Sequence, residues 1–592
     1  SYLGFIDTKI ELDSRTNYSI TLAESTNELN TVLITALGIK RETKSLGYAV
    51  QKVDGKDISV VKTPNLLDNL TGKLAGVNIT QGGSGVGSSS RIVIRGESSL
   101  SGDNQPLFVV NGVPISNSSG SNGRSQGNLE ADYGNGAAEI SPDDVESISV
   151  LKGANATALY GSRGANGVVL ITTKSGKGTK GLGISISSST TFETPLRVPK
   201  YQNKYGQGAG FNFEFVDGFG SGTNDNIDES WGPALDGRML VQHHSINADG
   251  NRAGDFINRP DGYTDQDSYE KLAWSPQENN IRDFFETGVS TNNNISFTGA
   301  NENSNFRLSY TNQYSKGILP NTDLKRNNIN LDLGHKMLND KLKFNANFNY
   351  INSGSKNRAN NSYGTENIMY LWVWFGRQIP MESLGNYWQT GQEGTQQFNY
   401  NYNWHDNPYF TMNENTNGFN KDRLLGNINM TYNLTKDLTM MVRTGTDVSN
   451  DLRQGRRAWS TQRFPLGQYR EDKIYFQERN TDFLINYKKD ISADFNFSVS
   501  AGGNQMTQTN RFNQVSANEL AVPGIYSFNN SNIPLLQNSF NSERQINSLY
   551  ANASFGFKNA IYVDLSGRND WASTLPEANN SYFYPSASLS FV

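Results

Sequence analysis

The residues that could perform catalysis or bind a metal are few in this sequence. It has four histidines and no cysteine, which excludes thiol catalysis, cysteine-based zinc sites and disulfides within these 592 residues. His243 and His244 are adjacent, so on a strand their side chains would point to opposite faces. In a loop both could reach one metal, but no third ligand follows at a suitable spacing, and His335 and His405 are isolated. Histidines without a metal are therefore the favoured interpretation.

Two acidic clusters supply oxygen atoms of the kind that calcium prefers. They comprise Asp225, Asp228 and Glu229, and Asp261, Asp265, Asp267 and Glu270. Both lack the glycine at the sixth position of an EF-hand loop, so solvated loop charge is the favoured interpretation. The glycine-rich segment Gly82–Gly87 lacks the Lys-Ser/Thr ending of a phosphate-binding loop. No Ser-His-Asp or paired-carboxylate pattern is present either, so the sequence predicts no catalytic residue, no metal, no cofactor and no enzyme.

Four tryptophans crowd into one segment that is rich in Asn, Gln and Tyr. They are Trp372, Trp374, Trp388 and Trp404. Flat aromatic faces beside amide groups suit sugar rings or peptides. The same rings could instead pack a large loop or dock a protein that acts as a lid, and the sequence leaves these alternatives open.

The composition fits a large β protein. Hydrophobic residues make up 35%, aromatic residues 11%, and the mean hydropathy is −0.60. No window holds the roughly 18 consecutive apolar residues that a transmembrane helix requires. A membrane β-barrel is nevertheless compatible, because its strands alternate outward apolar with inward polar residues. A soluble β protein stays open at this point, and the net charge of −5 gives no reason to expect nucleic acid as a partner.

Amphipathic strands recur from Gly181 to the end of the sequence. Many end in Tyr or Phe, as strands do where aromatic rings lie at the membrane interfaces. Short separations such as Met337–Lys341 alternate with long ones, Thr194–Asn293 and Asn352–Lys421, which is typical of transmembrane barrels. The candidate strands are Ile184–Phe192, Phe306–Tyr314, Asn328–Leu333, Leu342–Tyr350, Leu425–Tyr432, Leu438–Thr446, Thr481–Tyr487, Phe495–Ala501, Leu549–Phe557, Ala560–Gly567 and Tyr584–Phe591.

The segment Ser141–Lys174, SPDDVESISVLKGANATALYGSRGANGVVLITTK, has the pattern of a compact insert. Ser141 predicts the start of a helical turn, because a capping hydroxyl precedes a proline and two acidic residues. Ile148–Leu151 and Val168–Thr172 have the length and β-branching of strands. Gly153–Gly167 between them predicts a tight turn of small residues.

This segment resembles the plug-domain signature of TonB-dependent outer-membrane transporters, specifically the SusC/RagA-like family of Bacteroidota. Leu66–Gly96 (LLDNLTGKLAGVNITQGGSGVGSSSRIVIRG) and Gln105–Ile115 (QPLFVVNGVPI) match the same family in order and spacing. Within this region, Pro106–Pro114 predicts a buried strand and Ser116–Asn135 a long flexible loop. Similar family motifs follow, namely SWGPALDG (Ser230–Gly237), IRDFFETG (Ile281–Gly288), YSKGILPNTDLKRNNINLDL (Tyr314–Leu333) and YFYPSASLSF (Tyr582–Phe591). The resemblance covers essentially the whole chain.

The resemblance implies a mostly β fold, a plugged transmembrane antiparallel β-barrel of about 22 strands, with about the first half in this chain. It implies four regions: 1–23 as the end of a carboxypeptidase-like β-sandwich, 24–46 as a linker, 47–180 as a mixed α/β plug, and 181–592 as barrel with long extracellular loops. A half-barrel would leave two unpaired edges in hydrocarbon. We therefore expect further strands beyond Val592, or a partner that shields the open edge.

The linker contains an apolar segment flanked by polar residues. Such a segment could be an ordinary buried strand, or it could add as a strand to the sheet of a partner. Its position before the plug resembles that of the TonB box, which the periplasmic protein TonB binds. The expected TonB-binding residues are Val32, Leu33, Ile34, Thr35, Ala36, Leu37, Gly38 and Ile39.

The resemblance implies import of large nutrients, oligosaccharides or peptides, across the outer membrane with a SusD-like surface lipoprotein. TonB, ExbB and ExbD would couple import to the proton gradient, with the plug and N-terminus in the periplasm and lipid around the barrel. The alternative is a SusC-like barrel that acts as a scaffold subunit or client of a larger secretion or assembly machine.

Overall fold

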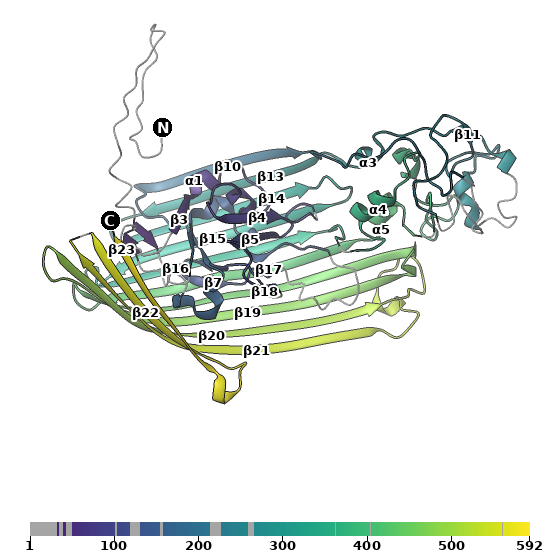
Figure 1. The fold of residues 1–592 in the computed structure, drawn as a ribbon. Coiled ribbons are helices and arrows are strands. Elements are labelled where there is room, and N and C mark those ends of the chain that lie inside the picture. Colours follow the sequence, from purple (N-terminus) through teal and green to yellow (C-terminus); the bar gives the residue numbers. More distant parts are fainter. Residues whose placement is uncertain are drawn as a thin grey trace, which may run out of the picture.

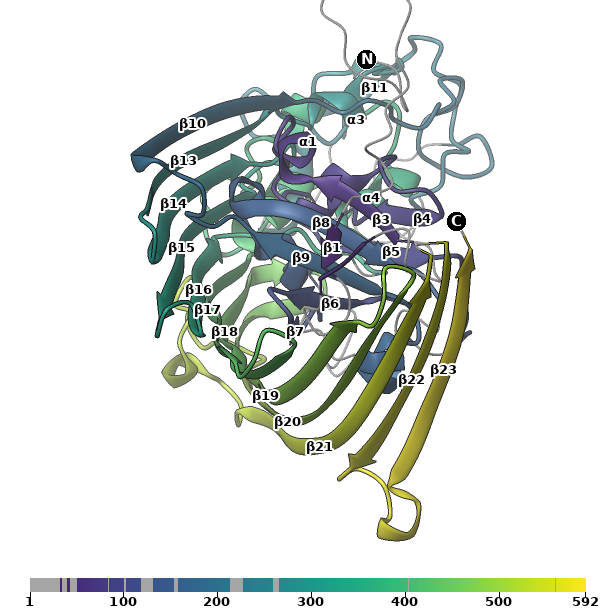
Figure 2. The same ribbon diagram turned by 90° about the vertical axis from the view of Figure 1, so that its left-hand side faces the viewer.

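The computed structural model describes residues 32–34, 40–42, 50–83, 85–100, 103–118, 131–153, 158–212, 227–258, 266–361, 363–402, 404–558 and 560–591. Three parts share these residues: a large curved sheet, a smaller unit on its concave side, and a unit built from two long loops (Figures 1 and 2). Among the described residues, no helix has the length and apolar character needed to span a membrane.

The large sheet, here called the wall, has 12 antiparallel strands that pair in the order of the sequence. Figure 2, seen along the strands, shows that it curves around the inner unit. Its strands are β10 (Gly181–Glu193), β13 (Gly288–Ala300), β14 (Ser304–Lys316), β15 (Asp323–Met337), β16 (Leu342–Ser355), β17 (Asn417–Asn433), β18 (Leu438–Thr461), β19 (Phe464–Asp490), β20 (Phe495–Ala517), β21 (Leu536–Phe557), β22 (Ile561–Ala572) and β23 (Ser581–Phe591).

Burial along the wall strands is inverted relative to a soluble protein. On β14 the side chains of Phe306 and Tyr310 are exposed, whereas Arg307 and Thr311 are each 3% exposed. Successive side chains of a strand point to opposite faces, so the apolar residues lie on the outer face and the polar ones face the inner unit. This is the alternation of a transmembrane barrel wall, and it confirms the expected fold class.

The connections between wall strands differ at the two ends. Turns at 301–303, 338–341, 434–437, 491–494 and 558–560 define a short-turn end. The loops 194–287 and 356–416 leave the opposite end, here called the long-loop end, on the right in Figure 1. Long loops therefore leave one end, as predicted, but that end also carries the short connections 317–322 and 462–463.

One wall strand, β13, was not predicted from the sequence. The separation Thr194–Asn293 was predicted to end within β13, and no strand was predicted between Phe192 and Phe306, which was wrong, because β13 pairs with both β10 and β14. Its sequence, GVSTNNNISFTGA, contains three consecutive asparagines that disfavour a strand by propensity. Pairing on both sides overrides that preference. Several other strands, such as β19, extend well beyond their predicted apolar cores for the same reason.

The inner unit is the plug, and its main sheet has five strands in the order β3-β8-β9-β6-β7. Only β6 and β9 pair in parallel. The elements are β3 (Val50–Asp54), α1 (Gly55–Ile58), η4 (Leu66–Leu70), β4 (Val77–Gln81), β5 (Ser90–Ile94), β6 (Leu107–Val110), β7 (Val113–Ile115), η5 (Gly136–Glu139), η6 (Pro142–Asp144), β8 (Val145–Leu151), η7 (Ala158–Gly164) and β9 (Val168–Thr173), and β4 pairs with β5 alone.

Most local predictions for the plug are confirmed. The Ser141 side chain accepts a hydrogen bond from the Asp143 N–H and begins η6, and β8 and β9 contain the two predicted strands. The prediction of a single strand at Pro106–Pro114 was wrong. Asn111 and Gly112 both have positive φ and turn the chain back, so β6 and β7 form a hairpin. Asn-Gly between apolar runs is the usual signal for this turn. Most of the predicted loop Ser116–Asn135 lies outside the described residues.

The plug core continues into the wall. A buried apolar cluster from η4, β5, β6, β8 and β9 also includes Ile351 of β16 and Leu425 of β17. Around these contacts, the facing surfaces are polar, and buried charges meet across them. Asp144 of the plug pairs with Arg307 of β14 at 2.7 Å, and the two side chains are 0% and 3% exposed.

The two long loops fold together into a third part, here called the long-loop unit. Its core joins residues from both loops, including Phe284, Leu371 and Phe398. Its elements are β11 (Met239–Leu240), η8 (Ala253–Asn258), η9 (Gln266–Ser268), β12 (Leu272–Ala273), α3 (Asn280–Asp283), α4 (Ile368–Trp374), η10 (Met381–Leu384) and α5 (Pro408–Glu414). Two further turns, η11 (Phe528–Asn530) and η12 (Glu577–Asn579), lie in the loops that follow β20 and β22.

We expect Asp144→Ala to loosen the plug, because it leaves Arg307 charged and buried without its partner. Breaking a buried pair in this way costs about 3–5 kcal/mol. The double variant Asp144→Ala/Arg307→Met, which removes both charges, should recover much of that loss. Hydrogen exchange of the β8 and β9 amides measures the difference. Equal exchange in the wild type and the single variant would show that this pair does not hold the plug.

Candidate functional site: the contact between plug and wall

Inward-facing arginines of the wall bind backbone carbonyl groups of the plug. Arg326 of β15 donates from Nη1 to the carbonyl oxygens of Pro64 and Ala138, each at 2.9 Å. Arg358, which follows β16, donates from Nε to the carbonyl of Asp132 at 2.9 Å. A guanidinium group presents five donors in a fixed fork, so one side chain can satisfy several carbonyls. The wall therefore recognises the shape of the plug backbone.

A cluster of four charges links η5 of the plug to β17 and β18. Glu139 accepts from Lys421 and from Arg423, each at 2.8 Å, and Arg423 also pairs with Asp447 at 2.8 Å. Arg423 donates further to the carbonyls of Gly136 and Ser116, at 2.7 and 3.0 Å. The Ser116 N–H in turn donates to Asp447 at 2.9 Å. Two cations and two carboxylates thus balance within one buried network.

The network keeps Glu139 ionised. Burial by itself would raise the pKa of the Glu139 carboxyl, but the charges of Lys421 and Arg423 outweigh it and lower the pKa from 4.5 to about 2. Glu139 is therefore ionised at neutral pH, and its carboxylate makes the ion pairs that hold the plug.

A third connection joins η7 of the plug to β19. Arg163 of η7 pairs with Glu478 of β19 at 2.7 Å, and Glu478 is 1% exposed. Close packing accompanies the charges, since a Cβ atom on Gly112 would clash with the guanidinium of Arg443. The positive φ of Gly112 makes any side chain there doubly unfavourable.

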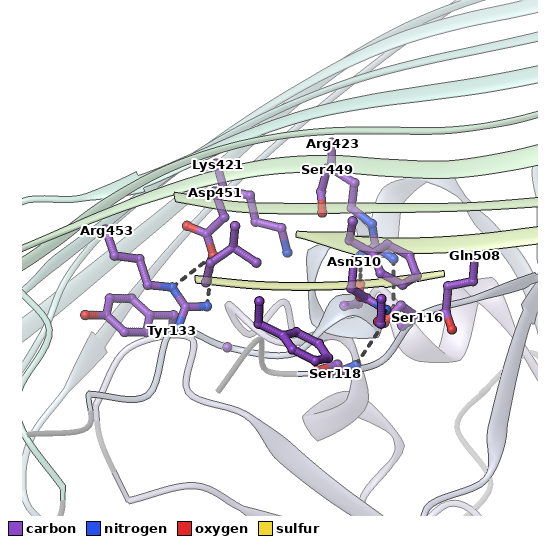
Figure 3. A pocket seen from close by; sticks show the side chains of 16 residues that line it. Ser116, Ser118, Tyr133, Lys421, Arg423, Ser449, Asp451, Arg453, Gln508 and Asn510 are labelled. Carbon is purple, nitrogen blue, oxygen red and sulfur yellow. Dashed lines mark hydrogen bonds and ion pairs between the residues drawn. The ribbon is translucent and has the colours of Figure 1, made fainter. Parts of the chain in front are cut away.

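A cavity of about 430 Å³ separates the plug from strands β17 to β21 (Figure 3). Ser116, Ser118 and Tyr133 line it from the plug, and Lys421, Arg423 and Asp451 line it from the wall. Figure 3 shows the guanidinium of Arg453 over the ring of Tyr133, at 4.0 Å from the ring centre. The lining combines charged, hydroxyl and aromatic groups.

Comparisons with known proteins agree with this architecture. The family model described as "TonB-dependent Receptor Plug Domain" matches residues 42–168. The TonB-dependent receptor SusC of Bacteroides thetaiotaomicron is 26% identical over 442 residues, which cover 73% of this chain and 38% of that protein. The TonB-dependent receptor P26 of Formosa agariphila is 25% identical over 616 residues, covering 99% of this chain and 52% of that protein.

The fold has matching solved structures. The RagAB peptide importer in its open-open state superposes with a TM-score of 0.65 at 20% identity, covering 94% of this chain and 58% of that chain. The ferric citrate transporter FecA superposes with a TM-score of 0.52 at 10% identity, over 92% of this chain. Together these matches show that the chain is SusC/RagA-like and carries the plug domain of TonB-dependent receptors. It spans about half the length of the curated relatives that it matches from end to end.

For a TonB-dependent receptor, the segment Val32–Ile39 is the expected coupling element. The structure describes Val32–Ile34 as strand β1, which pairs antiparallel with β2 (Lys40–Glu42). Thr35, Ala36, Leu37, Gly38 and Ile39 lie outside the described residues. The assignment of TonB binding to this segment stays a prediction.

The four tryptophans of this receptor have different environments. Trp372 is buried and packs edge-to-face on Phe284 and Phe375, so its ring helps to fold the long-loop unit. Trp374 and Trp388 are half-buried, whereas Trp404 is 47% exposed. Contact with a ligand or a lid stays a prediction, and Trp404 has the most surface available for it.

The loop histidines His243 and His405 are buried, and so is Asp228, whereas Glu229, Asp267 and Glu270 are exposed, in agreement with solvated loop charge. His243 is bonded to Ser383 at 2.8 Å, and His405 to Asp228 at 3.1 Å. Burial lowers the pKa of both His243 and His244, the latter to about 4. Within the part of the chain that the structure describes, no group of His, Asp and Glu side chains has the arrangement of a metal site. Asp225, Asp261 and Asp265 lie outside that part.

Sequence analysis missed the arginines that hold the plug. A signal existed for some of them, because an arginine between two outward-pointing apolar residues of a strand lies on the inner face. Arg307, for example, lies between Phe306 and Leu308, which point outward. In a barrel strand this position must face the lumen. The carboxylates that pair with these arginines are too distant in sequence to be found in the same way.

We expect plug attachment to weaken on acidification because of Glu139. Its pKa is lowered by folding, so its contribution is present above the ordinary value of 4.5 and is lost as the pH falls towards about 2. The protection factors of the β6 and β8 amides, which correct for the pH dependence of the intrinsic exchange rate, should therefore fall across that window in the wild type. In Glu139→Gln the attachment should be weaker at pH 7 and should change less with pH. Parallel pH profiles for the two proteins would contradict this role.

Proposed function

We propose that this receptor imports large nutrients, oligosaccharides or peptides, across the outer membrane in a TonB-dependent reaction. The observation that supports this most is the plug itself, which occupies the concave side of the wall and is held there by buried ion pairs. A diffusion pore would not need such a blockage. Displacing a plug held by buried charges requires work, which the proton gradient would supply through TonB, ExbB and ExbD.

Coupling would begin at β1. In the proposal, β1 and the residues after it form the TonB-binding segment within a linker at 24–46, between a sandwich remnant at 1–23 and a plug at 47–180. The barrel part would be 181–592. The pairing of β1 with β2 spans three residues, and an isolated two-stranded sheet is marginal in water. A partner strand could therefore compete for β1 at small cost through backbone hydrogen bonds.

The long-loop unit would face the cell exterior and receive a SusD-like lipoprotein. Helix α4 exposes Met369 and Val373, one turn apart, and Trp404 exposes half of its surface. Exposed apolar residues of this kind are common at protein contacts. The relative RagAB is described as a peptide importer, which supports a role in nutrient import. The short-turn end, the plug and the N-terminus would then be periplasmic, with lipid around the wall.

Energy coupling can be tested with proline in the TonB-binding segment. Proline removes a backbone donor and fixes φ, so Ile34→Pro and Ala36→Pro should break a strand pairing. Ile34→Ala keeps the N–H group and is the matched control. We expect the combined proline variant to lose uptake of the cognate nutrient at normal outer-membrane levels, with the alanine variant close to wild type. Normal growth on that nutrient with both prolines would refute TonB-driven import and favour the scaffold alternative.

Orientation can be tested by labelling, because the sequence has no cysteine of its own. Asn386 is exposed in the long-loop unit, and Lys436 is exposed in the turn 434–437 at the short-turn end. An impermeant thiol reagent should label Asn386→Cys but not Lys436→Cys in intact cells, and both after lysis. Labelling of Lys436→Cys alone in intact cells would reverse the proposed orientation.

A further inference from the structure

One buried carboxylate joins the loop 356–416 to the hairpin formed by β18 and β19. Asp406 is 1% exposed, and its Oδ1 accepts from the N–H of Gln462, in the turn between the two strands, at 2.8 Å. The same oxygen accepts from Nε2 of Gln397 at 2.6 Å, and that nitrogen also donates to the carbonyl of Ser460 at 2.6 Å. Asp406 therefore lies at the centre of the contact between loop and hairpin.

Charge at this contact does not balance. Glu366 and Asp406 are both buried, and the cation that acts on both of them is Arg457 of β18. Nε of Arg457 pairs with Glu366 at 2.6 Å, and its Nη2 donates to the side-chain oxygen of Asn417 at 3.0 Å. Among the described residues, no salt bridge joins a cation to Asp406. One guanidinium thus faces two carboxylates, and Asp406 is the one without a counter-ion.

The oxygen atoms of the two acids show the same imbalance. Oδ2 of Asp406 is buried without a hydrogen-bond partner in the described part of the chain, and so is Oε1 of Glu366. An unpaired buried carboxylate is unfavourable and usually takes up a proton instead. Burial accordingly raises the pKa of the Asp406 carboxyl from 3.8 to about 7, and the charge of Glu366 adds to the rise, although the two donors to Oδ1 oppose it.

The other charged residues on the neighbouring parts of the loop and hairpin are His405, Glu414, Arg456 and Arg463. His405 is bonded to Asp228 at 3.1 Å, and Glu414 accepts from the hydroxyl of Tyr387 at 2.9 Å. Arg456 lies over the ring of Tyr526, and Arg463 is exposed. None of the four forms a salt bridge with Asp406, so none compensates its negative charge.

We propose that this contact is a pH-sensitive joint, in which a proton on Asp406 keeps the loop 356–416 docked on the β18–β19 hairpin and loss of that proton loosens the loop. An ionised Asp406 requires water, and water can reach it only if loop and hairpin separate. Because residues of this loop form much of the core of the long-loop unit, the loosening would extend to that unit. The inference does not rest on the import function.

The direction of the pH effect follows from the raised pKa of Asp406 in the docked state. Its contribution to docking is fully present below the ordinary value of 3.8 and is lost as the pH rises through about 7. Between these values, each pH unit should weaken docking about tenfold. Docking should therefore be tighter in mildly acidic than in mildly alkaline solution.

Hydrogen exchange of the detergent-purified receptor at pH 5.5 and pH 8.5 tests this. Protection factors, which correct for the pH dependence of the intrinsic exchange rate, are compared for the amides of α5 and of Gln462. We expect them to fall about tenfold or more between the two pH values. The amides of β8 and β9 in the plug are the internal reference and should change little. Equal protection of α5 and Gln462 at both pH values would overturn the proposal.

Two variants identify the titrating group. Asp406→Asn keeps an acceptor for both donors but cannot ionise, so its protection should be high at both pH values. Glu366→Gln leaves Arg457 available to neutralise Asp406, so the fall in protection should be smaller and should occur at lower pH. Glu382→Gln, which changes an exposed acid of the same loop, is the matched control and should show the wild-type fall.

The variants also exclude the other titratable pair of the long-loop unit, His405 with Asp228. A full wild-type fall in Asp406→Asn or in Glu366→Gln would assign the pH dependence to another group and reject the joint. Protection of β8 and β9 at pH 5.5 shows whether each variant is folded. Because the two substitutions act on different side chains, a folding defect in one leaves the other to decide.

Discussion

Buried charge at the contact between plug and wall is the constraint on which the rest of this receptor depends. The wall must present apolar side chains to its outer face, so its polar side chains point inward, where the plug excludes water from them. Arg307, Arg326 and Arg423 are each nearly inaccessible and each satisfy their donors with carboxylates or carbonyls. A buried guanidinium without such partners would cost several kcal/mol. The plug therefore stabilises the wall by supplying partners for its buried arginines, and the wall in turn holds the plug through the same contacts.

Some wall arginines have a carboxylate partner on the wall itself, and others have one only on the plug. This difference affects how easily the plug can move. Arg423 has one carboxylate on the wall, Asp447, and one on the plug, Glu139, so it keeps a partner if the plug shifts. Arg443 pairs within the wall, with Asp482 at 2.5 Å. Arg307 relies on Asp144 of the plug for its carboxylate. On electrostatic grounds, separation of the plug from β17 leaves Arg423 with a carboxylate, whereas separation from β14 or β19 leaves Arg307 or Glu478 without the counter-ion that the plug supplies.

Much of the fold could be predicted from short stretches of the sequence, because strand alternation and helix capping depend on neighbouring residues. Alternation of apolar and polar residues requires strands, and the Ser-Pro-Asp-Asp run at Ser141 begins η6 where capping predicts it. Family motifs identify the plug. Local rules fail where pairing overrides propensity, as in β13, whose asparagines are held in a strand by neighbours on both sides. They also fail at Asn111-Gly112, where an overlooked turn signal divides one predicted strand into a hairpin.

The sequence by itself determined the kind of protein, a plugged β wall, because alternation, glycine turns and motif order are properties of neighbouring residues. Only the tertiary structure decided which charges meet. Glu139 and Lys421 are far apart in sequence, and nothing local to either residue indicates their contact or the lowered pKa of Glu139. The same holds for the cavity, whose lining comes from the plug and five wall strands. Such sites depend on distant segments being brought together, and the shape of the whole sheet sets their spacing.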